Sequence, residues 1–124
     1  MEKSRLKVLI VEDEFFIALD AEEQVKSLGH VVVGTAVSAE QAIQIAGETR
    51  PDVVLMDIRL IGPMDGIAAA LEIRSLYGIE AIFVTANTDP STLARAESIG
   101  PVAVLQKPLT RARLAAQLAQ LPAR

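Results

Sequence analysis

Five short apolar runs, each of strand length and rich in branched residues, recur along the chain at residues 6–11, 31–33, 53–56, 81–84 and 102–105. Such continuous runs, rather than strict alternation, are typical of strands that are buried on both faces of a sheet. The pattern therefore predicts five strands in a sheet that is covered on both sides.

Segments of helix length, each with an apolar stripe, lie between these runs. Two of the stripes consist of Ile17, Ala21, Val25 and Leu28, and of Ile67, Leu71 and residues 73–76. The order of elements is thus five strands alternating with five helices.

Residues that begin or end helices fall where this order requires them. Gly29 and Gly78 follow the first and third stripes, and the Asp65-Gly66 turn leads into the third helix. Helix-capping residues precede the second, fourth and fifth helices: Ser38 with Gln41 three residues later, Asp89 before Pro90, and Thr110.

Short connections between alternating strands and helices require right-handed crossovers, and hence a mostly parallel sheet. We therefore predict an α/β fold, a doubly wound (βα)₅ sheet. Its 124 residues are enough for one core, and no linker or repeat interrupts them, so we expect a single domain over residues 1–124.

The composition excludes several classes of function. The chain has no cysteine, which removes disulfides and thiolate metal sites, and its net charge of -4 gives no general attraction to nucleic acid or anionic membranes. The run 6–11 is too short for a signal peptide, and no stretch has the length of a membrane span. We expect a soluble, cytoplasmic protein, with Arg111, Arg113 and Arg124 on a solvated face.

Polar side chains end four of the five strands. Glu12 and Asp13 end the first, Asp57 the third and Thr85 the fourth, and the fifth runs into Lys107. In an open parallel sheet, ligands bind outside the carboxyl ends of the strands. Three carboxylates that converge there would repel one another unless a cation lay among them, and Mg²⁺ is the cation that suits carboxylate oxygens.

The remaining strand-end groups suit phosphate. The Thr85 hydroxyl and the Lys107 ammonium can donate hydrogen bonds to phosphoryl oxygens, and Asp57 follows the third strand as a candidate nucleophile. Phosphoryl transfer needs mainly an in-line nucleophile and neutralisation of the oxygens.

In this order and on this pattern, the strand-end motifs resemble the signature of the CheY-like receiver family over residues 6 to about 121. They are Glu12-Asp13, Asp57, Thr85-Ala86 and Lys107-Pro108. The resemblance implies the strand order 2-1-3-4-5 and a cis Lys107-Pro108 bond. It also implies Mg²⁺ held by Asp13, Asp57 and the main-chain carbonyl of Arg59, with Glu12 helping directly or through water.

The resemblance further implies a bacterial two-component function. Asp57 would take a phosphoryl group from the phosphohistidine of a sensor histidine kinase or a phosphotransfer protein, with Lys107 and Thr85 on the phosphoryl oxygens. The chain would catalyse only its own phosphorylation and dephosphorylation. Its output face, about residues 91–121 on the fourth helix, fifth strand and fifth helix, would bind a protein partner or a second copy. We expect no output domain, no direct nucleic-acid contact and no membrane contact.

The sequence departs from the family pattern at a few positions. Val104 stands where many members have a switch aromatic, and the loop at 58–66 is one residue longer than a common form. Arg59 and Asn87 fill the variable positions that, in this family, tune attack by water, and Arg59 could either pair with Glu12 or shield the phosphoryl group. His30 is expected on the surface, and Phe15 and Phe16 are expected to divide between the core and the mouth of the site.

Three other functions compete with this one. A haloacid-dehalogenase-like phosphatase needs a second aspartate two residues after the nucleophile, where this chain has Arg59. A flavodoxin-like cofactor binder shares the architecture, but the chain has one tyrosine, no tryptophan and no hydroxyl-rich loop after the first strand. A pseudo-receiver, which keeps the fold and acts only as an interaction module, stays open as the alternative.

Overall fold

The computed structural model describes residues 5–86 and 89–122, so Asn87 and Arg124 lie outside the described residues. The strands are β1 Lys7–Val11, β2 Val31–Ala36, β3 Val53–Asp57, β4 Glu80–Thr85 and β5 Ala103–Gln106. The helices are α1 Phe15–Ser27, α2 Ala39–Thr49, α3 Gly66–Tyr77, α4 Pro90–Ser98 and α5 Arg111–Leu118. Each of the five predicted strands and each intervening helix is present.

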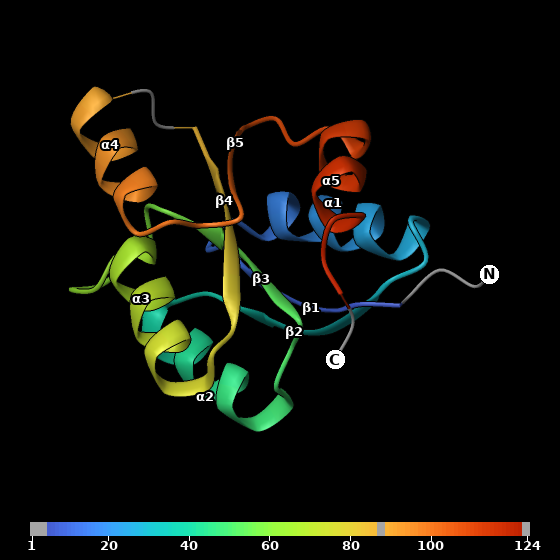
Figure 1. Ribbon diagram of the computed structural model, residues 1–124, viewed down its shortest axis with the longest axis horizontal. Helices are drawn as coiled ribbons and strands as arrows, with labels where there is room; N and C mark the ends of the chain where they lie inside the picture. The colour runs from blue at the N-terminus through green and yellow to red at the C-terminus, as the bar shows by residue number, and fades with distance from the viewer. Residues whose placement is uncertain (1–4, 87–88, 123–124) are drawn as a thin grey trace.

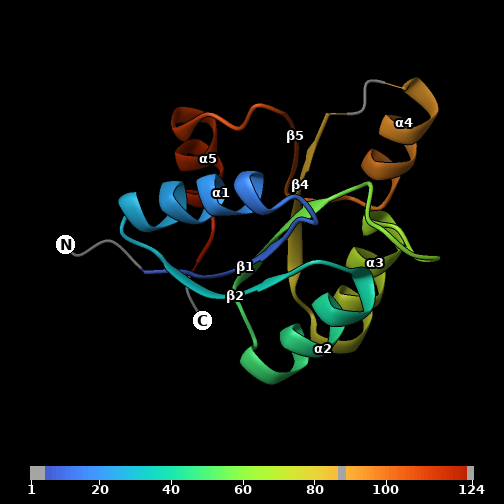
Figure 2. The same ribbon diagram turned by 180° about the vertical axis from the view of Figure 1, so that it is seen from behind.

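The strands form one parallel sheet in the order β2-β1-β3-β4-β5, which confirms the predicted architecture. Helices α1 and α5 cover one face, and α2, α3 and α4 cover the other (Figures 1 and 2). Two apolar clusters fill the spaces between these layers. In the described part of the chain, no helix combines the length and the apolar character that crossing a membrane requires.

Side chains that alternate along the strands feed the two clusters. Leu9 of β1 and Phe83 of β4 pack toward α2, α3 and α4, whereas Ile10 and Ile82 pack toward α1 and α5. The central strands β1, β3 and β4 are almost wholly buried, as the continuous apolar runs predict. For the edge strands the prediction of burial on both faces is wrong, because each lacks a neighbour on one side: Val31 of β2 is 38% exposed.

The predicted helix caps Ser38, Asp89 and Thr110 are confirmed, and Asp65, predicted only as part of a turn, also caps a helix. Ser38, Asp65, Asp89 and Thr110 each accept a hydrogen bond from the backbone N–H three residues later. Gly29 and Gly78 have positive φ angles of 89° and 70°, which suit the ends of helices. Each connection therefore turns where the sequence specifies, and the strands point their carboxyl ends to one edge.

Two predictions of buried apolar side chains are wrong, one of them only in part. Leu71 and Leu76 belong to the predicted stripe of α3 but lie 44% and 56% exposed, since the helix turns Ile67 and Ile73 toward the sheet instead. Phe15 and Phe16 are both exposed, so the predicted core position is wrong, whereas Phe16 borders the pocket beside Glu12 and Asp57, as a place at the mouth of the site requires. The Arg111 and Arg113 side chains are exposed, as expected.

Candidate functional site

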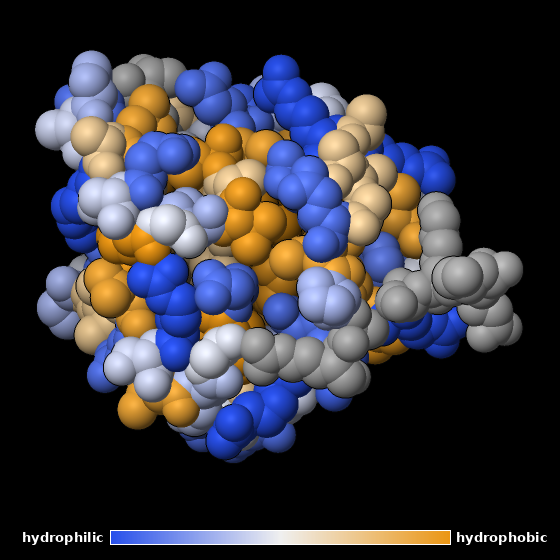
Figure 3. Space-filling model, in the orientation of Figure 1, coloured by the Kyte–Doolittle hydropathy of each residue, from blue (hydrophilic) through white to orange (hydrophobic). Residues whose placement is uncertain are grey.

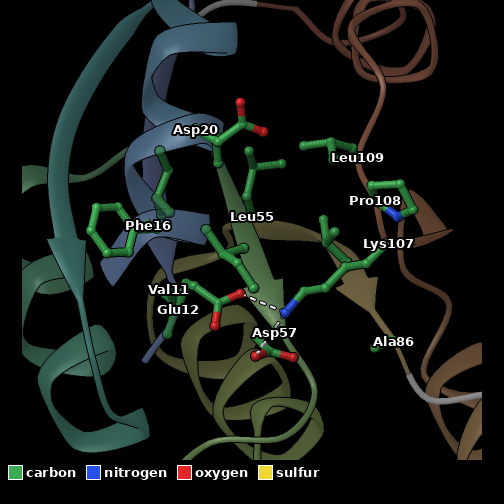
Figure 4. Close-up of a pocket in the computed structure, with 14 residues that line it drawn as sticks. Val11, Glu12, Phe16, Asp20, Leu55, Asp57, Ala86, Lys107, Pro108 and Leu109 are labelled. Carbon is green, nitrogen blue, oxygen red and sulfur yellow. Dashed lines mark hydrogen bonds and ion pairs between the residues drawn. The ribbon is translucent and has the colours of Figure 1, made fainter. Parts of the chain in front are cut away.

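Charged side chains from three strands meet at the carboxyl edge of the sheet. Glu12 and Asp13 directly follow β1, Asp57 ends β3, and Lys107 directly follows β5. One carboxylate oxygen from each acid lies within 4.8 Å of the others. Figure 4 shows Glu12, Asp57 and Lys107 pointing toward one another. Residues far apart in sequence thus form one cluster.

Lys107 joins the ends of these strands. Its Nζ donates to Glu12 Oε1 at 2.6 Å and to Asp57 Oδ2 at 3.3 Å. Its backbone N–H donates to the carbonyl of Thr85 at 2.9 Å, and its bond to Pro108 is cis, as predicted. The ammonium is largely buried, so little solvent screens these two ion pairs.

Burial and charge set the protonation of the cluster. Burial, together with the Glu12 charge, raises the pKa of Asp57 to about 6, although Lys107 works in the opposite direction. Burial also acts to raise the pKa of Glu12, but hydrogen bonds from Lys107 and from the Glu14 N–H outweigh it and hold that pKa below its usual value. Asp57 is therefore the acid that folding makes hardest to ionise.

Gly66 is a structural part of the site that sequence reasoning treated only as a turn. Its N–H donates to the Ile58 carbonyl at 2.8 Å, and a Cβ at this position would overlap with the carbonyl oxygen of Asp57. Only glycine permits this close approach between the start of α3 and the end of β3. The Asp65-Gly66 pair indicates a turn in the sequence, but the requirement for glycine at position 66 follows only from the position of the Asp57 carbonyl in the structure.

Asp65, next to Gly66, connects the site to α4. Its Oδ1 accepts from the Ala68 N–H at 2.9 Å, and its Oδ2 accepts from Arg95 of α4 at 2.6 Å. Burial acts to raise the pKa of Asp65, but these two hydrogen bonds and the Arg95 charge lower it overall. The start of α3 is thus tied both to Asp57 and to α4.

Arg59 lies at the polar opening of the site. Its backbone N–H donates to Asp57 Oδ1 at 3.3 Å, and its side chain borders the same hollow as Asp13 and Asp57. Within the described residues it makes no ion pair with Glu12, which Lys107 engages instead. Of the two roles expected for Arg59, the described residues therefore do not show the pairing with Glu12.

Thr85 and His30 lie in different surroundings. Thr85 is fully buried at the end of β4, and its backbone is fixed next to Lys107 by the hydrogen bond from the lysine N–H. His30 is half-buried rather than freely exposed, and its Nδ1 accepts from the Leu6 N–H at 3.0 Å, where β1 begins. It therefore has a structural contact away from the acidic cluster.

The donor set of the cluster fits a hard divalent cation. Glu12, Asp13 and Asp57 supply carboxylate oxygens, which Mg²⁺ prefers, and no histidine or cysteine lies among them. A divalent cation would also offset the repulsion that raises the pKa of Asp57.

Comparison with known proteins agrees with this geometry. A family model described as the response regulator receiver domain matches residues 8–119. The phyllosphere-induced regulator PhyR of Methylorubrum extorquens is 35% identical over 92% of this chain and 42% of its own length. The transcriptional regulatory protein PdtaR of Mycobacterium tuberculosis is 36% identical over 84% of this chain and 50% of its own length. The chain thus spans about half the length of these relatives.

Solved structures share the fold closely. The signal receiver domain of a modulated diguanylate cyclase from Desulfovibrio desulfuricans aligns with a TM-score of 0.89 at 33% identity, over 94% of this chain and 93% of that one. The receiver domain of PhyR from Erythrobacter litoralis aligns with a TM-score of 0.82 at 32% identity, over 94% and 89%. The strand order, the acidic edge and these matches together show that the chain belongs to the response regulator receiver domain family.

Proposed function

We propose that this receiver accepts a phosphoryl group on Asp57 from the phosphohistidine of a histidine kinase or a phosphotransfer protein, in a Mg²⁺-dependent reaction. One observation carries the proposal: the Asp57 carboxylate, only 7% exposed, ends the central strand within reach of Lys107 and two further carboxylates. Such a site suits a nucleophile that meets a highly charged phosphoryl group.

The cation would be held by Asp13, Asp57 and the main-chain carbonyl of Arg59, with Glu12 helping directly or through water. When bound, Mg²⁺ would supply positive charge against the carboxylates and the phosphoryl oxygens. The structure contributes the three converging carboxylates on which this assignment depends.

Asp57, Lys107 and Thr85 would have different roles in the phosphoryl transfer. An Asp57 oxygen attacks phosphorus, an O–P bond forms and the P–N bond of the phosphohistidine breaks, which returns its electron pair to the imidazole. Lys107 already donates to Asp57, so its ammonium can move onto a new phosphoryl oxygen. The Thr85 hydroxyl, from the end of the neighbouring strand, would donate to another.

Water access after transfer would depend on Arg59. Its side chain borders the polar opening above Asp57, and its charge acts as far as Asp89 at the start of α4. We expect Arg59→Ala to change the rate of dephosphorylation more than the extent of phosphorylation. Phosphoprotein decay followed by mass spectrometry tests this, and equal changes in both quantities would contradict it.

The phosphorylated site would signal through the face formed by α4, β5 and α5. Hydrophobic residues gather over β5 in the view of Figure 3, where Ala103, Val104 and Leu105 are only half-buried. An apolar band between polar helices suits a protein partner or a second copy of the chain. Phosphorylation adds roughly -1.5 to -2 charges at the strand ends, and the Asp65–Arg95 pair offers one path from there to α4.

The proposal is tested by intact mass after incubation with acetyl phosphate and Mg²⁺. One phosphoryl adduct on the wild type, absent from Asp57→Asn and from an EDTA control, would support a Mg²⁺-dependent receiver that modifies only itself. Absence of the adduct from folded wild type would favour the alternative, a pseudo-receiver that binds partners without phosphorylation. Bacterial relatives such as PdtaR make a cytoplasmic bacterial pathway the natural setting to search for the kinase.

A further inference from the structure

A cavity of about 500 Å³ opens beside the acidic cluster, between α1 and the segment that follows β5 (Figure 4). Its floor consists of Ile10 of β1, Leu55 of β3 and Val84 of β4. Cavities of roughly 300–1,000 Å³ with mostly apolar walls are typical of small-molecule sites. The volume of this cavity and its mostly apolar lining are therefore typical of a small-molecule binding pocket.

Two features keep the cavity open. Gln24 Nε2 of α1 donates to the Leu109 carbonyl at 2.9 Å and so joins the two walls at a fixed separation. Beside Ile17 and Asp20, α1 contributes only the small Ala21 to the wall, and the Phe16 ring at the rim is turned outward, because the residue is 79% exposed. No large side chain therefore fills the space.

The charges that border the cavity are predominantly negative. Glu12, Asp57 and Asp20 contribute carboxylates, and Lys107, the one cation among the lining residues, already donates to two of them. Asp20 lies at the opposite end of the pocket from Asp57 in Figure 4. Its Oδ2 accepts from Gln24 at 2.9 Å, whereas Oδ1 accepts no hydrogen bond from the described residues. An anionic ligand would meet repulsion here, and a cationic one attraction.

We propose that this cavity binds a small amphipathic cation, an amine with an apolar body of about the size of one aromatic ring. The body would lie on Ile10, Leu55 and Val84, and the ammonium would pair with Asp20 Oδ1, away from the carboxylates assigned to Mg²⁺. A ligand in this position adjoins Lys107 and Phe16 at the entrance to Asp57. The inference is independent of phosphorylation, since binding is measured without it.

Binding is tested by titrating 2-phenylethylamine into isotope-labelled protein in saturating Mg²⁺, with phenylacetate as a probe that has the same ring and the opposite charge. We expect saturable backbone amide shifts in α1, at Lys107 and Leu109, and at Ile10, Leu55 and Val84. An exposed ion pair is worth up to about 1 kcal/mol, so the amine should bind roughly threefold to fivefold more tightly than phenylacetate.

Substitutions distinguish binding inside the cavity from binding elsewhere on the surface. Ala21→Leu should fill the cavity and abolish the shifts, whereas Ala94→Leu on the exposed surface of α4 should leave them unchanged. Asp20→Asn, an exposed change that keeps the fold, should retain binding of the ring but remove the preference for the amine.

Three results would each overturn the proposal: the absence of saturable shifts, unchanged binding in Ala21→Leu, or shifts that are confined to residues 12, 13 and 57 and appear only in a parallel titration without Mg²⁺. The last pattern would mean that the amine merely replaces the metal.

Discussion

The interior of the sheet and its carboxyl edge are buried to a similar extent but have opposite chemistry. In β3, Val54 and Leu55 are at most 3% exposed, and Asp57 at the end of the same strand is 7% exposed. Burial of the apolar pair stabilises the fold, whereas burial of a carboxylate beside Glu12 opposes folding and raises the pKa of Asp57 to about 6. One strand thus supplies both stability and an unfavourable charge.

This difference means that the charged edge lowers the stability of the fold, whereas the apolar interior raises it. Lys107 offsets part of the cost, but a buried cluster of two carboxylates and one ammonium keeps an excess of negative charge. A divalent cation and an arriving phosphoryl group would change that balance, whereas nothing comparable acts on the apolar interior. Substitutions in the two regions should therefore have opposite consequences.

The largest effect on stability is expected for Phe83→Ala. Phe83 is fully buried in the cluster beneath α2, α3 and α4, so truncation should lower the free energy of unfolding by about 3–5 kcal/mol. Phe16→Ala removes the same side chain from an exposed position and should change it by less than about 0.5 kcal/mol. Urea unfolding measures both variants. Equal losses in the free energy of unfolding would contradict the expected difference between the buried Phe83 and the exposed Phe16.

Gly66→Ala should be next in size. The added methyl group would overlap with the Asp57 carbonyl, so we expect a loss of about 2–3 kcal/mol together with slower phosphorylation. Gly78→Ala is the matched control: it meets open space at a φ of 70° and should cost about 1–2 kcal/mol without altering phosphorylation. If Gly66→Ala phosphorylated as fast as the wild type, the backbone contact would not matter to the site.

Asp57→Asn should stabilise the metal-free protein near neutral pH, in contrast to any change in the interior. The folded pKa of about 6 exceeds the ordinary 3.8, so the wild type loses stability as pH rises between these values. Asparagine does not titrate, and its advantage should be on the order of 1–2 kcal/mol above that range and vanish below it.

Thermal unfolding in EDTA across this pH range measures the effect of Asp57→Asn. Glu12 and Lys107 interact directly with Asp57, so the difference between the two proteins measures the Asp57 charge together with these interactions. If Asp57→Asn were less stable than the wild type at neutral pH, the ionised Asp57 carboxylate would not lower the stability of the folded protein.

The smallest effect is expected for the connection between the site and α4. Arg95→Ala removes a partly exposed ion pair and should cost at most about 1 kcal/mol. Asp65→Ala also removes the cap of α3 and should cost about 1 kcal/mol more. Chemical denaturation measures the free energy of unfolding of both variants. A larger loss for Arg95→Ala than for Asp65→Ala would contradict the expectation that the helix cap adds to the cost.

Much of the fold could be predicted because its signals are local. Continuous apolar runs indicated the strands, and Ser38, Asp89 and Thr110 marked helix starts that the structure confirms. The strand order came from the family resemblance rather than from the pattern. Central and edge strands look alike in sequence, so the exposure of Val31 could not be predicted from its apolar neighbours.

Only those site residues that directly end or follow a strand could be predicted from the sequence. The positions of Glu12, Asp13, Asp57 and Lys107 after their strands predicted that they would meet at one edge, where the structure brings them together. The overlap at Gly66, the Asp65–Arg95 pair and the open cavity depend on distances between segments remote in sequence. No local pattern encodes those distances.

The most direct test of Asp57 as the phosphoacceptor is chemical trapping of the acyl phosphate. Wild-type protein incubated with acetyl phosphate and Mg²⁺ would be reduced with borohydride, which converts an aspartyl phosphate into homoserine, and then digested for peptide mass spectrometry. We predict homoserine at position 57 alone, absent when EDTA is present. Homoserine at another aspartate, the corresponding alcohol at a glutamate, or no reduced residue in protein that carries phosphate would contradict the assignment of Asp57.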